Sequence, residues 1–363
     1  MKDIKSKKTV FVGMSGGVDS SVAAALLKKQ GFNVVGVYMK NWTQDLGFGC
    51  PWLEESQEAR RVANVLKFPF YIWDFEKEYY SRVIKYFFSE YKAGRTPNPD
   101  VMCNKEIKFK MFLNKALSYG ADYVATGHYA QVKEVKSKKK KITRFKLLKA
   151  IDPAKEQSYF LYNLTQKELS RIFFPIGKYK KTDVRKLAKK FKLPNYNRKD
   201  SQGICFIGPV NVRDFLKQNI KSKNGDIIDD KGKILGSHDG LPYYTIGQRE
   251  GIRLGGKGPY YVIDKDLKKN LLIVSNNPKH KLLWRYRMEV SEISRVNSRI
   301  KFPSNAKIAI RYHHPESQCK ITQKPNKLLI RFIKPQRAIT LGQSAVIYKG
   351  QELLGGGVIS KVF

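Results

Sequence analysis

A glycine-rich loop at residues 13–21, with the sequence GMSGGVDSS, most constrains what this chain can fold into. The loop lies between a short apolar run at 9–12 and an amphipathic pattern that predicts a helix over 18–30. Glycines let a backbone turn tightly and approach a ligand closely, and the amides at a helix N-terminus attract anions. The sequence therefore predicts a phosphate site on a strand–turn–helix unit, with a purely structural glycine turn as the alternative.

Two details of the loop narrow its chemistry. No lysine follows the second glycine, so the loop is not the P-loop of γ-phosphate hydrolases. Ser15, Ser20 and Ser21 can add hydroxyl donors, and Asp19, an acidic residue in a phosphate site, suggests magnesium. We therefore expect a nucleotide bound together with Mg²⁺.

Strand-like and helix-like segments alternate through the first half of the chain. Apolar or β-branched runs predict strands at 9–12, 33–39, 70–73 and 123–126, and helical periodicity marks 18–30, 54–66, 78–91 and 106–119. Such alternation is typical of an α/β fold with a doubly wound parallel sheet, whose ligands bind at the carboxyl ends of the strands.

The pattern predicts three domains. Residues 1–210 form the nucleotide-binding catalytic domain, from which a basic hairpin near 132–148 protrudes. Short strands and turns then predict a small β-rich domain at 211–280 and a C-terminal β-barrel at 281–363. The hairpin carries a run of four lysines at 138–141, which either contacts RNA or is a solvated loop.

The charge balance favours a polyanionic partner. The chain has 70 Lys and Arg against 31 Asp and Glu, a net charge of +39. Such an excess repels itself in the compact state and attracts nucleic acid, which would neutralise it. A lysine-rich proteome is the alternative explanation.

The sequence indicates a cytoplasmic protein. No apolar run reaches the roughly 18 residues of a membrane span, and the apolar stretch near the N-terminus is too short for a signal peptide. In that compartment we expect Cys50, Cys103, Cys205 and Cys319 to be thiols, and any disulfide to be catalytic rather than structural.

Two of the cysteines lie in loops marked by proline or glycine. Residues 96–105 read TPNPDVMCNK, where Asp100 lies one turn before Cys103, and Lys105 and a helix start at Asn104 would favour a thiolate. Residues 200–206 read DSQGICF, with a glycine two residues before Cys205. Each cysteine alone could be structural, but together they suggest a sulfur-relay pair.

The other cysteines have no such context. Cys50 and Cys319 lie in no motif, so we expect buried or bystander thiols there. His313 and His314 do not have zinc-ligand spacing relative to Cys319, so no zinc site is expected.

Taken jointly, the glycine loop and the two cysteine loops resemble those of the bacterial tRNA-specific 2-thiouridylases, in the PP-loop ATP pyrophosphatase superfamily. The resemblance covers nearly the whole chain. It includes MKNW at 39–42, TGHY at 126–129, KEQSY at 155–159, GLPYYTIGQR at 240–249, and PQRA at 335–338 with GQ at 342–343. The chain departs from the family at 47–52 and in its unusually basic run at 138–141.

This resemblance implies a PP-loop domain of the adenine nucleotide α-hydrolase type and assigns roles to individual residues. ATP with Mg²⁺ would contact the loop, with adenine near Met39 and a further contact at Gly127; the loop contacts are Gly13, Met14, Ser15, Gly16, Gly17, Val18, Asp19 and Ser20. The wobble uridine of a tRNA of the Lys, Glu or Gln type would flip out of its stack onto Asn98, Pro99 and Asp100. Further tRNA contacts would be His128, Lys155, Glu156, Gln157, Arg311, Tyr312 and Gln343.

The resemblance also implies the reaction. The C2 oxygen of the uridine would attack the α-phosphate of ATP, and Asp100 would orient or deprotonate the base. Cys205 would receive a persulfide from a sulfur-donor protein, either a cysteine desulfurase or a sulfur-relay carrier. Cys103 would then release sulfide or form a disulfide with Cys205, leaving 2-thiouridine.

Three alternatives stay open on the sequence. Asp100, Cys103 and Cys205 could instead ligate an iron–sulfur cluster that holds the sulfur. The chain could be another PP-loop ATP pyrophosphatase that acts as a small-molecule ligase or amidator. It could also be an RNA-binding protein that keeps the nucleotide fold as a scaffold.

Overall fold

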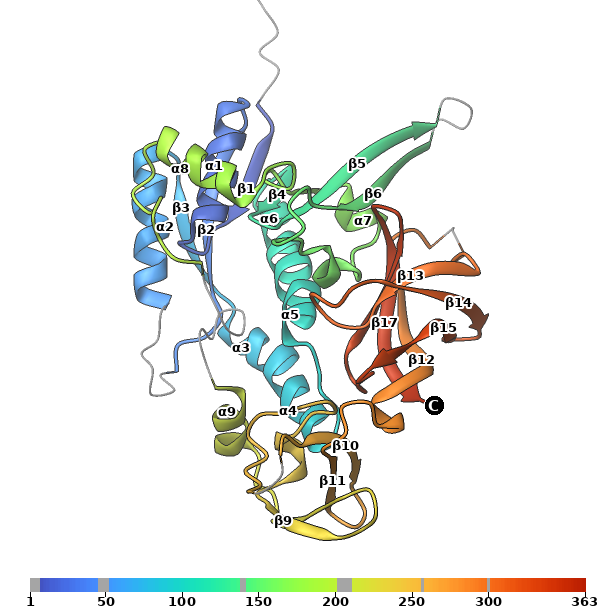
Figure 1. Ribbon diagram of the computed structural model, residues 1–363. Coiled ribbons are helices and arrows are strands. Elements are labelled where there is room, and N and C mark those ends of the chain that lie inside the picture. Colours follow the sequence, from blue (N-terminus) through green and yellow to red (C-terminus); the bar gives the residue numbers. More distant parts are fainter. Residues whose placement is uncertain (1–6, 45–51, 138–141, 201–210, 256–257, 299–300) are drawn as a thin grey trace, which may run out of the picture.

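The computed structural model describes residues 7–44, 52–137, 142–200, 211–255, 258–298 and 301–363 (Figure 1). Within these residues the strands form three sheets of five, four and eight strands. Figure 1 shows them as three separate regions, with the parallel sheet and its helices at one end and the C-terminal barrel at the other. The fold class predicted from the sequence is confirmed, whereas the domain boundaries near 210 and 280 stay a prediction.

The first sheet is parallel throughout, in the order β3-β2-β1-β4-β7. Its strands are β1 (Thr9–Gly13), β2 (Asn33–Lys40), β3 (Phe70–Asp74), β4 (Tyr123–Thr126) and β7 (Ile172–Phe173). The chain builds outward from β1 to β3 and then returns to the other side of β1 with β4. The order therefore reverses between β1 and β4, where Gly13 pairs with Thr126, and a ligand crevice is expected at such a switch point.

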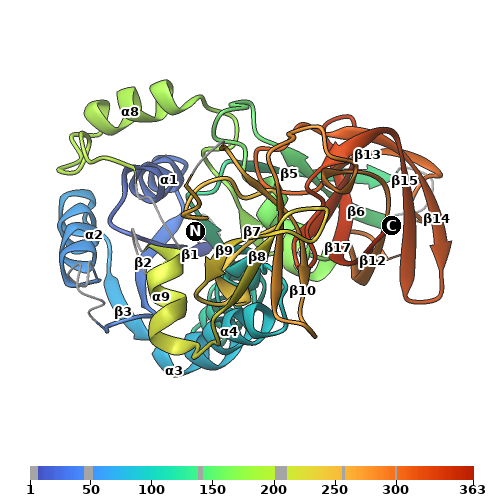
Figure 2. The ribbon, with the colours of Figure 1, turned by 60° about the horizontal axis from the view of Figure 1, so that its bottom comes forward.

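Helices cover both faces of this sheet because successive strand residues point to opposite sides. Val10 and Val12 pack in one buried cluster with α1 (Val18–Lys29), α2 (Trp52–Leu66) and α8 (Lys181–Lys190). Figure 2 shows α8 and α1 together on this side.

On the opposite face, Phe11 packs in a second cluster with two helical stretches that a short loop joins. The elements are α3 (Glu76–Tyr79), η1 (Tyr80–Ile84), α4 (Lys85–Lys92), α5 (Pro99–Met102), η2 (Cys103–Phe112) and α6 (Leu113–Ser118). The predicted helix at 78–91 is confirmed, but the start predicted near 104–106 is wrong. The helix begins at Pro99 because the Asn98 side chain caps it, accepting a hydrogen bond from the Val101 amide at 3.1 Å.

The central domain pairs a small sheet with a helix that the sequence pattern did not predict. Its sheet has the order β10-β11-β8-β9, and its elements are α9 (Val212–Asn219), β8 (Gly225–Ile228), β9 (Ile234–His238), η4 (Leu241–Tyr243), β10 (Tyr261–Asp266) and β11 (Leu271–Ser275). Phe215 of α9 lies against Trp42, Phe87 and Phe88 of the first domain, with ring centroids 5.1–6.0 Å apart. The two domains thus share one apolar core.

The third sheet closes into a barrel, because β12 pairs with both β15 and β17. After η5 (Lys281–Leu283) its strands are β12 (Trp284–Arg295), β13 (Asn305–Ala309), β14 (Ser317–Lys324), β15 (Lys327–Arg337), β16 (Ser344–Lys349) and β17 (Glu352–Val362). Cys319 lies in the barrel core, 3% exposed. Burial raises the pKa of its thiol to about 12, as expected of a bystander.

The basic hairpin joins the catalytic domain to the barrel. It consists of β5 (Ala130–Ser137) and β6 (Ile142–Lys149), and Figure 1 shows it projecting from the body of the molecule. At its base β6 pairs with β17, so the hairpin extends the barrel sheet. The lysine run at 138–141 lies outside the described residues.

Two short elements complete the first domain, η3 (Ser158–Leu161) and α7 (Gln166–Leu169). The capping box of Thr165 and Glu168 opens α7. Among the described residues, no helix is both long and apolar enough to span a bilayer.

Candidate functional site

The glycine loop lies at the switch point between β1 and β4, at the carboxyl ends of the strands. Its hydroxyls hold the loop rather than projecting from it. Ser20 Oγ accepts a hydrogen bond from the Ser15 amide at 3.2 Å and donates to the Gly17 carbonyl at 3.2 Å. Ser21 Oγ donates to the same carbonyl at 2.9 Å. The amides at the start of α1 have no partner within the helix and are the groups available to an anion.

Two glycines allow close backbone contacts around the loop. Gly16 has φ +72°, and a Cβ there would lie well under 3.0 Å from the Glu55 carbonyl of α2. Gly127 follows β4, and a Cβ there would lie 2.6 Å from the Ser20 nitrogen. Gly127, which the family resemblance assigned to ATP, therefore lies directly against the loop backbone.

Asp19 is held by an ion pair and a hydrogen bond. Lys181 Nζ lies 2.7 and 2.8 Å from the two carboxylate oxygens, and the Tyr129 hydroxyl donates to one of them at 2.8 Å. Burial, and then the charge of Asp19, raise the pKa of Tyr129, so the phenol keeps its proton and donates. The carboxylate is thus fixed at the first turn of α1, beside the amides.

Lys181 connects the loop to a second carboxylate. Asp200 lies 2.8 Å from Lys181, 2.6 Å from Lys155 and 2.8 Å from Arg185. Although burial raises it, the hydrogen bonds from Lys155 and Lys181 bring the pKa of Asp200 down to about 2. Lys181 thus lies between Asp19 of the glycine loop and Asp200, and Lys155 and Arg185 complete an ion-pair network that begins at the loop.

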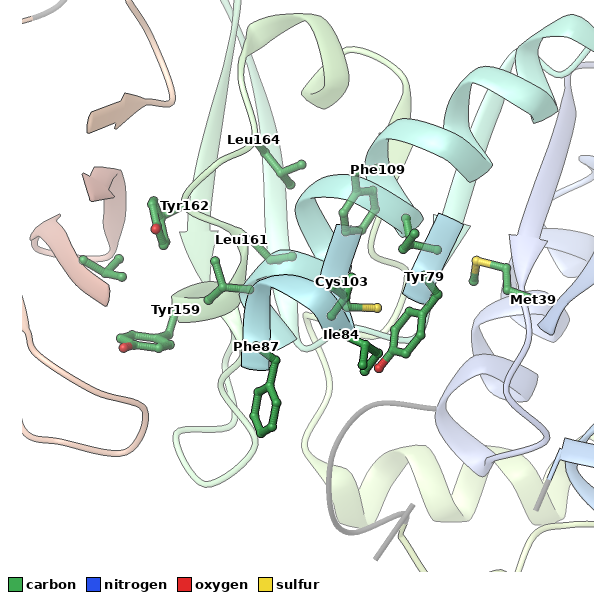
Figure 3. Packing of buried hydrophobic residues seen from close by; sticks show 14 of the residues in the cluster. Met39, Tyr79, Ile84, Phe87, Cys103, Phe109, Tyr159, Leu161, Tyr162 and Leu164 are labelled. Atoms are coloured by element: carbon green, nitrogen blue, oxygen red, sulfur yellow. The ribbon is translucent and has the colours of Figure 1, made fainter. Parts of the chain in front are cut away.

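Cys103 is fully buried and lies five residues into its helix. Because the helix starts at Pro99, the unpaired amides of its first turn end before Cys103, so the proposed thiolate stabilisation by a helix start at Asn104 is wrong. Lys105 is exposed and lies 4.0 Å from Glu106. Figure 3 shows Cys103 in an apolar cluster with Tyr79, Ile84 and other residues.

The partner cysteine cannot be placed. Cys205 and Cys50 lie outside the described residues, so the structure does not test the Cys103–Cys205 pair. Asp100 is half-buried, and its carbonyl accepts a hydrogen bond from Asn104 Nδ2 at 2.9 Å. In the part of the chain that is described, no group of three His, Cys, Asp or Glu could hold a metal ion.

Met39 and His128 are buried next to the site. Met39 is 3% exposed, and a Cβ on Gly13 would lie 3.0 Å from its Cε. The His128 Nδ1 lies 2.7 Å from Thr126 Oγ1, between the rings of Phe109 and Phe174. Burial lowers the pKa of His128, so its ring is neutral. Their contacts to adenine and to tRNA stay predictions.

The KEQSY segment is turned toward the protein. Besides the bond of Lys155 to Asp200, Glu156 accepts from the Ser158 amide at 2.7 Å, and burial raises the pKa of its carboxyl. The Gln157 side-chain Oε1 accepts a hydrogen bond from the Tyr129 backbone amide at 3.0 Å, and the Gln157 backbone amide donates to the Tyr129 carbonyl at 2.9 Å. The segment therefore fixes the strand that follows Gly127.

The barrel and the central domain meet the loop that leads into the Cys103 helix. Gln343 Nε2 donates to the Thr96 carbonyl at 2.9 Å and to the Pro97 carbonyl at 3.3 Å. Thr96 also lies 3.1 Å from the hydroxyl of Thr245 in the central domain. Three domains thus hold the loop that precedes Asn98.

A small pocket opens beside this junction. Asn98, Met102 and Lys105 line it from the helix, and Asn163, Glu292 and Ser344 line it from the facing segments. The Tyr312 ring packs against those of Phe160 in η3 and of His313, with ring centroids 4.3 and 3.9 Å apart and the planes tilted by 47°. Burial, and then the charge of Arg337, lower the pKa of Arg311.

Sequence reasoning missed three residues that shape the site: Tyr129, Lys181 and Asn195. Tyr129 belongs to the TGHY segment, but its bond to Asp19 has no local signal. Lys181 begins a helix whose other lysines are exposed, and Asn195 lies in no motif. Only the three-dimensional structure brings them to the loop.

Family models match three successive segments of the chain. They are described as tRNA methyl transferase HUP domain at residues 8–209, tRNA methyl transferase PRC-barrel domain at 213–276, and aminomethyltransferase beta-barrel domain at 285–359. The tRNA-specific 2-thiouridylase MnmA 1 of Geobacillus kaustophilus is 48% identical over 365 residues, which cover 98% of this chain and 96% of that protein. The chain belongs to the tRNA-specific 2-thiouridylase family.

Other members of the family are nearly as similar. The MnmA proteins of Listeria monocytogenes serotype 4b and Bacillus subtilis are 47% and 46% identical, each covering 98% of this chain and 95% of the relative. The resemblance drawn from the sequence motifs is thereby confirmed. Among solved structures, a 4-thiouridine synthetase–RNA complex with bound ATP aligns with a TM-score of 0.37 at 19% identity, covering 55% of this chain and 45% of that one, which is too low to carry an argument.

Proposed function

We propose that this member of the 2-thiouridylase family is an ATP-dependent sulfurtransferase that converts the wobble uridine of tRNA into 2-thiouridine. The observation that carries the proposal is the glycine loop at the β1/β4 switch point, with an acidic residue fixed in the first turn of the helix that follows. Family membership over 98% of the chain supports the same reaction.

ATP binds with its phosphates against the amides at the start of α1. Lys181 lies beside these amides, where it pairs with Asp19, and its ammonium group can attract a phosphate. Mg²⁺ commonly binds through one or two carboxylates together with substrate phosphates, and Asp19 fits that requirement. When bound, the ion would offset the charge that develops on the phosphates.

The reaction proceeds by activation and then substitution. The C2 oxygen of the uridine attacks the α-phosphate, pyrophosphate leaves, and an adenylated base results. A persulfide sulfur on Cys205 attacks C2 and AMP leaves with the oxygen. The Cys103 thiolate then attacks Cys205 Sγ, so that the sulfur remains on the base and a Cys103–Cys205 disulfide forms, which a cellular thiol reduces.

The base binds near the start of the Cys103 helix. Asn98, Pro99 and Asp100 form its first turn, and the pocket lined by Asn98 lies between this helix and the barrel. We assign base contact and proton transfer to Asp100, and tRNA contact to Arg311 and Tyr312. The net charge of +39 supports a nucleic-acid substrate, and we place the protein in the cytoplasm, where its sulfur donor is a persulfide-carrying protein.

The test is the mass of the tRNA. Unmodified tRNA incubated with the protein, ATP, a thiol reductant, and a cysteine desulfurase with cysteine as the persulfide source should gain the mass difference between sulfur and oxygen, with release of one pyrophosphate per modified base. Reactions without ATP, and with Asp19→Ala, serve as controls and should leave the mass unchanged. Pyrophosphate release at the same rate without tRNA, with no gain in tRNA mass, would instead indicate a small-molecule ligase.

Two further measurements separate the sulfur routes. Cys205→Ser should abolish thiolation while tRNA affinity stays within a few-fold of wild type. Anaerobically purified protein should contain neither iron nor acid-labile sulfide; their presence in stoichiometric amounts would replace the persulfide route by a cluster ligated by Asp100, Cys103 and Cys205.

A further inference from the structure

Asn195 is a buried polar residue that lies in no motif. It follows α8 on a short segment and is 3% exposed, although its neighbours Pro194 and Tyr196 are exposed. It is 179 residues from Gly16 in sequence and yet contacts it directly. A polar side chain at such a position needs a physical reason, because burying an amide has a cost unless it is hydrogen-bonded.

The side-chain amide of Asn195 grips the glycine loop at two points. Its Nδ2 donates to the Gly16 carbonyl at 2.7 Å and to Ser21 Oγ at 3.0 Å. Ser21 Oγ in turn donates to the Gly17 carbonyl at 2.9 Å. Asn195 thereby holds the Gly16 carbonyl directly and supports the Gly17 carbonyl through Ser21, alongside the hydrogen bonds that Ser20 Oγ and the Ser21 amide donate to the same carbonyl at 3.2 and 3.3 Å.

Fixing these carbonyls also fixes the amides that follow them. In a trans peptide the carbonyl and the next N–H point in opposite directions, so holding the Gly16 carbonyl sets the direction of the Gly17 amide. Holding the Gly17 carbonyl sets that of the Val18 amide in the same way. Glycines do not select one orientation by themselves, since their backbone is permissive. Within the loop the Gly17 amide makes a long hydrogen bond, 3.4 Å to Ser15 Oγ, and the Asn195 anchor adds a shorter restraint on the same peptide.

A second observation separates this anchor from ordinary packing. The Asn195 Oδ1 is buried and has no hydrogen-bond partner among the described residues. An unsatisfied buried oxygen is destabilising, and apolar side chains of similar size would avoid the loss. The side chain is oriented by its donors, because turning the amide over would place Oδ1 against the Gly16 carbonyl.

We propose that Asn195 is a positioning residue that orients the Gly17 and Val18 amides toward the phosphates of ATP. The proposal rests on the proposed function, in which ATP occupies the glycine loop. Asn195 does not touch the nucleotide; it acts through the loop backbone and through Ser21. Its contribution is therefore to nucleotide affinity.

The experiment compares three variants in the full-length protein. Asn195→Ala removes both donors, and Asn195→Asp keeps the shape but turns an acceptor and a negative charge toward the Gly16 carbonyl. Asn197→Ala is the matched control, since Asn197 lies two residues on and is exposed. Equilibrium ATP binding, tRNA binding and thermal unfolding are measured for each, together with kcat and KM for ATP in tRNA-dependent pyrophosphate release.

Asn195→Ala should raise the Kd and KM for ATP about five- to tenfold, as expected for the loss of one or two hydrogen bonds. Asn195→Asp should raise them further, and both should bind tRNA as wild type does; Asn197→Ala should change nothing. A lower melting temperature with an unchanged Kd for ATP in both Asn195 variants would show a merely structural role and overturn the proposal. Failure of the wild type itself to bind ATP would instead overturn the proposed function.

Ser21→Ala provides an independent arm, should the Asn195 variants not fold. It removes the hydroxyl that carries the anchor to Gly17, so the Kd for ATP should rise severalfold. In the double variant with Asn195→Ala, the loss of ATP-binding free energy should be smaller than the sum of the losses in the two single variants, because both substitutions break the same chain of hydrogen bonds. Wild-type ATP affinity of Ser21→Ala would contradict the relay.

Discussion

A side chain can be excluded near the glycine loop for two reasons, a positive φ or a lack of space, and three glycines near α1 allow these two effects to be measured separately. Gly31 has φ +89° and open space around it, so a methyl group there meets only backbone strain. Gly127 lacks a positive φ, but its Cβ would lie 2.6 Å from the Ser20 nitrogen. Gly16 combines φ +72° with contact to the Glu55 carbonyl.

The expected losses of unfolding free energy follow from these geometries. Gly31→Ala should cost about 1 kcal/mol, the strain of a left-handed residue. Gly127→Ala should cost about 1–3 kcal/mol through overpacking against backbone that cannot rotate away. Gly16→Ala carries both terms and should cost about 2–5 kcal/mol.

The effects on ATP affinity should differ from the effects on stability. Gly16→Ala and Gly127→Ala push directly on the loop, so each should raise the Kd for ATP at least about tenfold by displacing amides that must meet a phosphate. Gly31 lies at the other end of α1, about 18 Å along the helix. Gly31→Ala should therefore bind ATP as wild type does.

The measurements are urea unfolding followed by circular dichroism, and equilibrium ATP binding at a temperature where all variants are folded. Gly31→Ala serves as the matched control, since it introduces the same methyl group with similar strain. If Gly16→Ala is no less stable than Gly31→Ala, the close contact with α2 does not constrain the loop. If Gly16→Ala is destabilised but binds ATP normally, the loop is not the phosphate site.

Three other changes test the surroundings of the loop. Lys181→Met leaves Asp19 without its cation and should raise the Kd for ATP about tenfold, whereas Lys186→Met, at an exposed position of the same helix that pairs with Asp183, should leave it within about twofold, as measured by equilibrium binding. Burial raises the pKa of Asp200, but hydrogen bonds from two lysines lower it to about 2 in the folded protein. Because the folded pKa is depressed, the stabilisation from the Asp200 carboxylate is present above the ordinary carboxyl pKa and is lost as the pH falls toward 2. Asp200→Asn should therefore remove about 1 kcal/mol at pH 6 and almost none near pH 2, measured by urea unfolding; equal losses at both pH values would contradict this. Gln343→Leu removes the barrel's hydrogen bonds to the loop before the Cys103 helix and should raise the KM for tRNA about fivefold while the Kd for ATP stays unchanged.

Much of the first domain could be predicted from the sequence because its signals are local. The strands are short apolar runs, the helices have one apolar face, and Gly13 through Ser21 join one to the other. Hydrophobic period and turn chemistry decide such elements within a few residues. The alternation also predicts that the strands run parallel, but it gives neither their order nor the two-residue strand β7.

The start of the Cys103 helix was missed for an equally local reason. Asn98 followed by Pro99 reads as a turn, and the two prolines suggested an extended loop. Proline is also favoured at the first position of a helix, where its missing N–H has no partner in any case. The Asn98 cap decided between the two readings, and it places Cys103 beyond the reach of the first-turn amides.

The residues that surround the glycine loop could not be predicted, because no local pattern encodes a long-range pair. Tyr129 and Lys181 lie 110 and 162 residues from Asp19 in sequence. The sequence pattern of a basic helix is the same whether one of its lysines faces a carboxylate or water. The family resemblance identified the loop but not the residues that hold it.

The support of the loop explains why a contiguous motif is not by itself a binding site. Ordering one backbone residue costs about 1–2 kcal/mol, and glycine loses the most freedom of all. Here α2 lies against Gly16, the turn after β4 lies against Ser20, and Asn195 holds the Gly16 carbonyl, so three segments, the farthest of them 179 residues from Gly16, fix the loop before any ligand arrives. Folding of the domain therefore supplies the ordering free energy that ATP would otherwise have to offset. In the proposed site, affinity for the nucleotide would then depend on residues that never touch it, because the whole domain orders the loop.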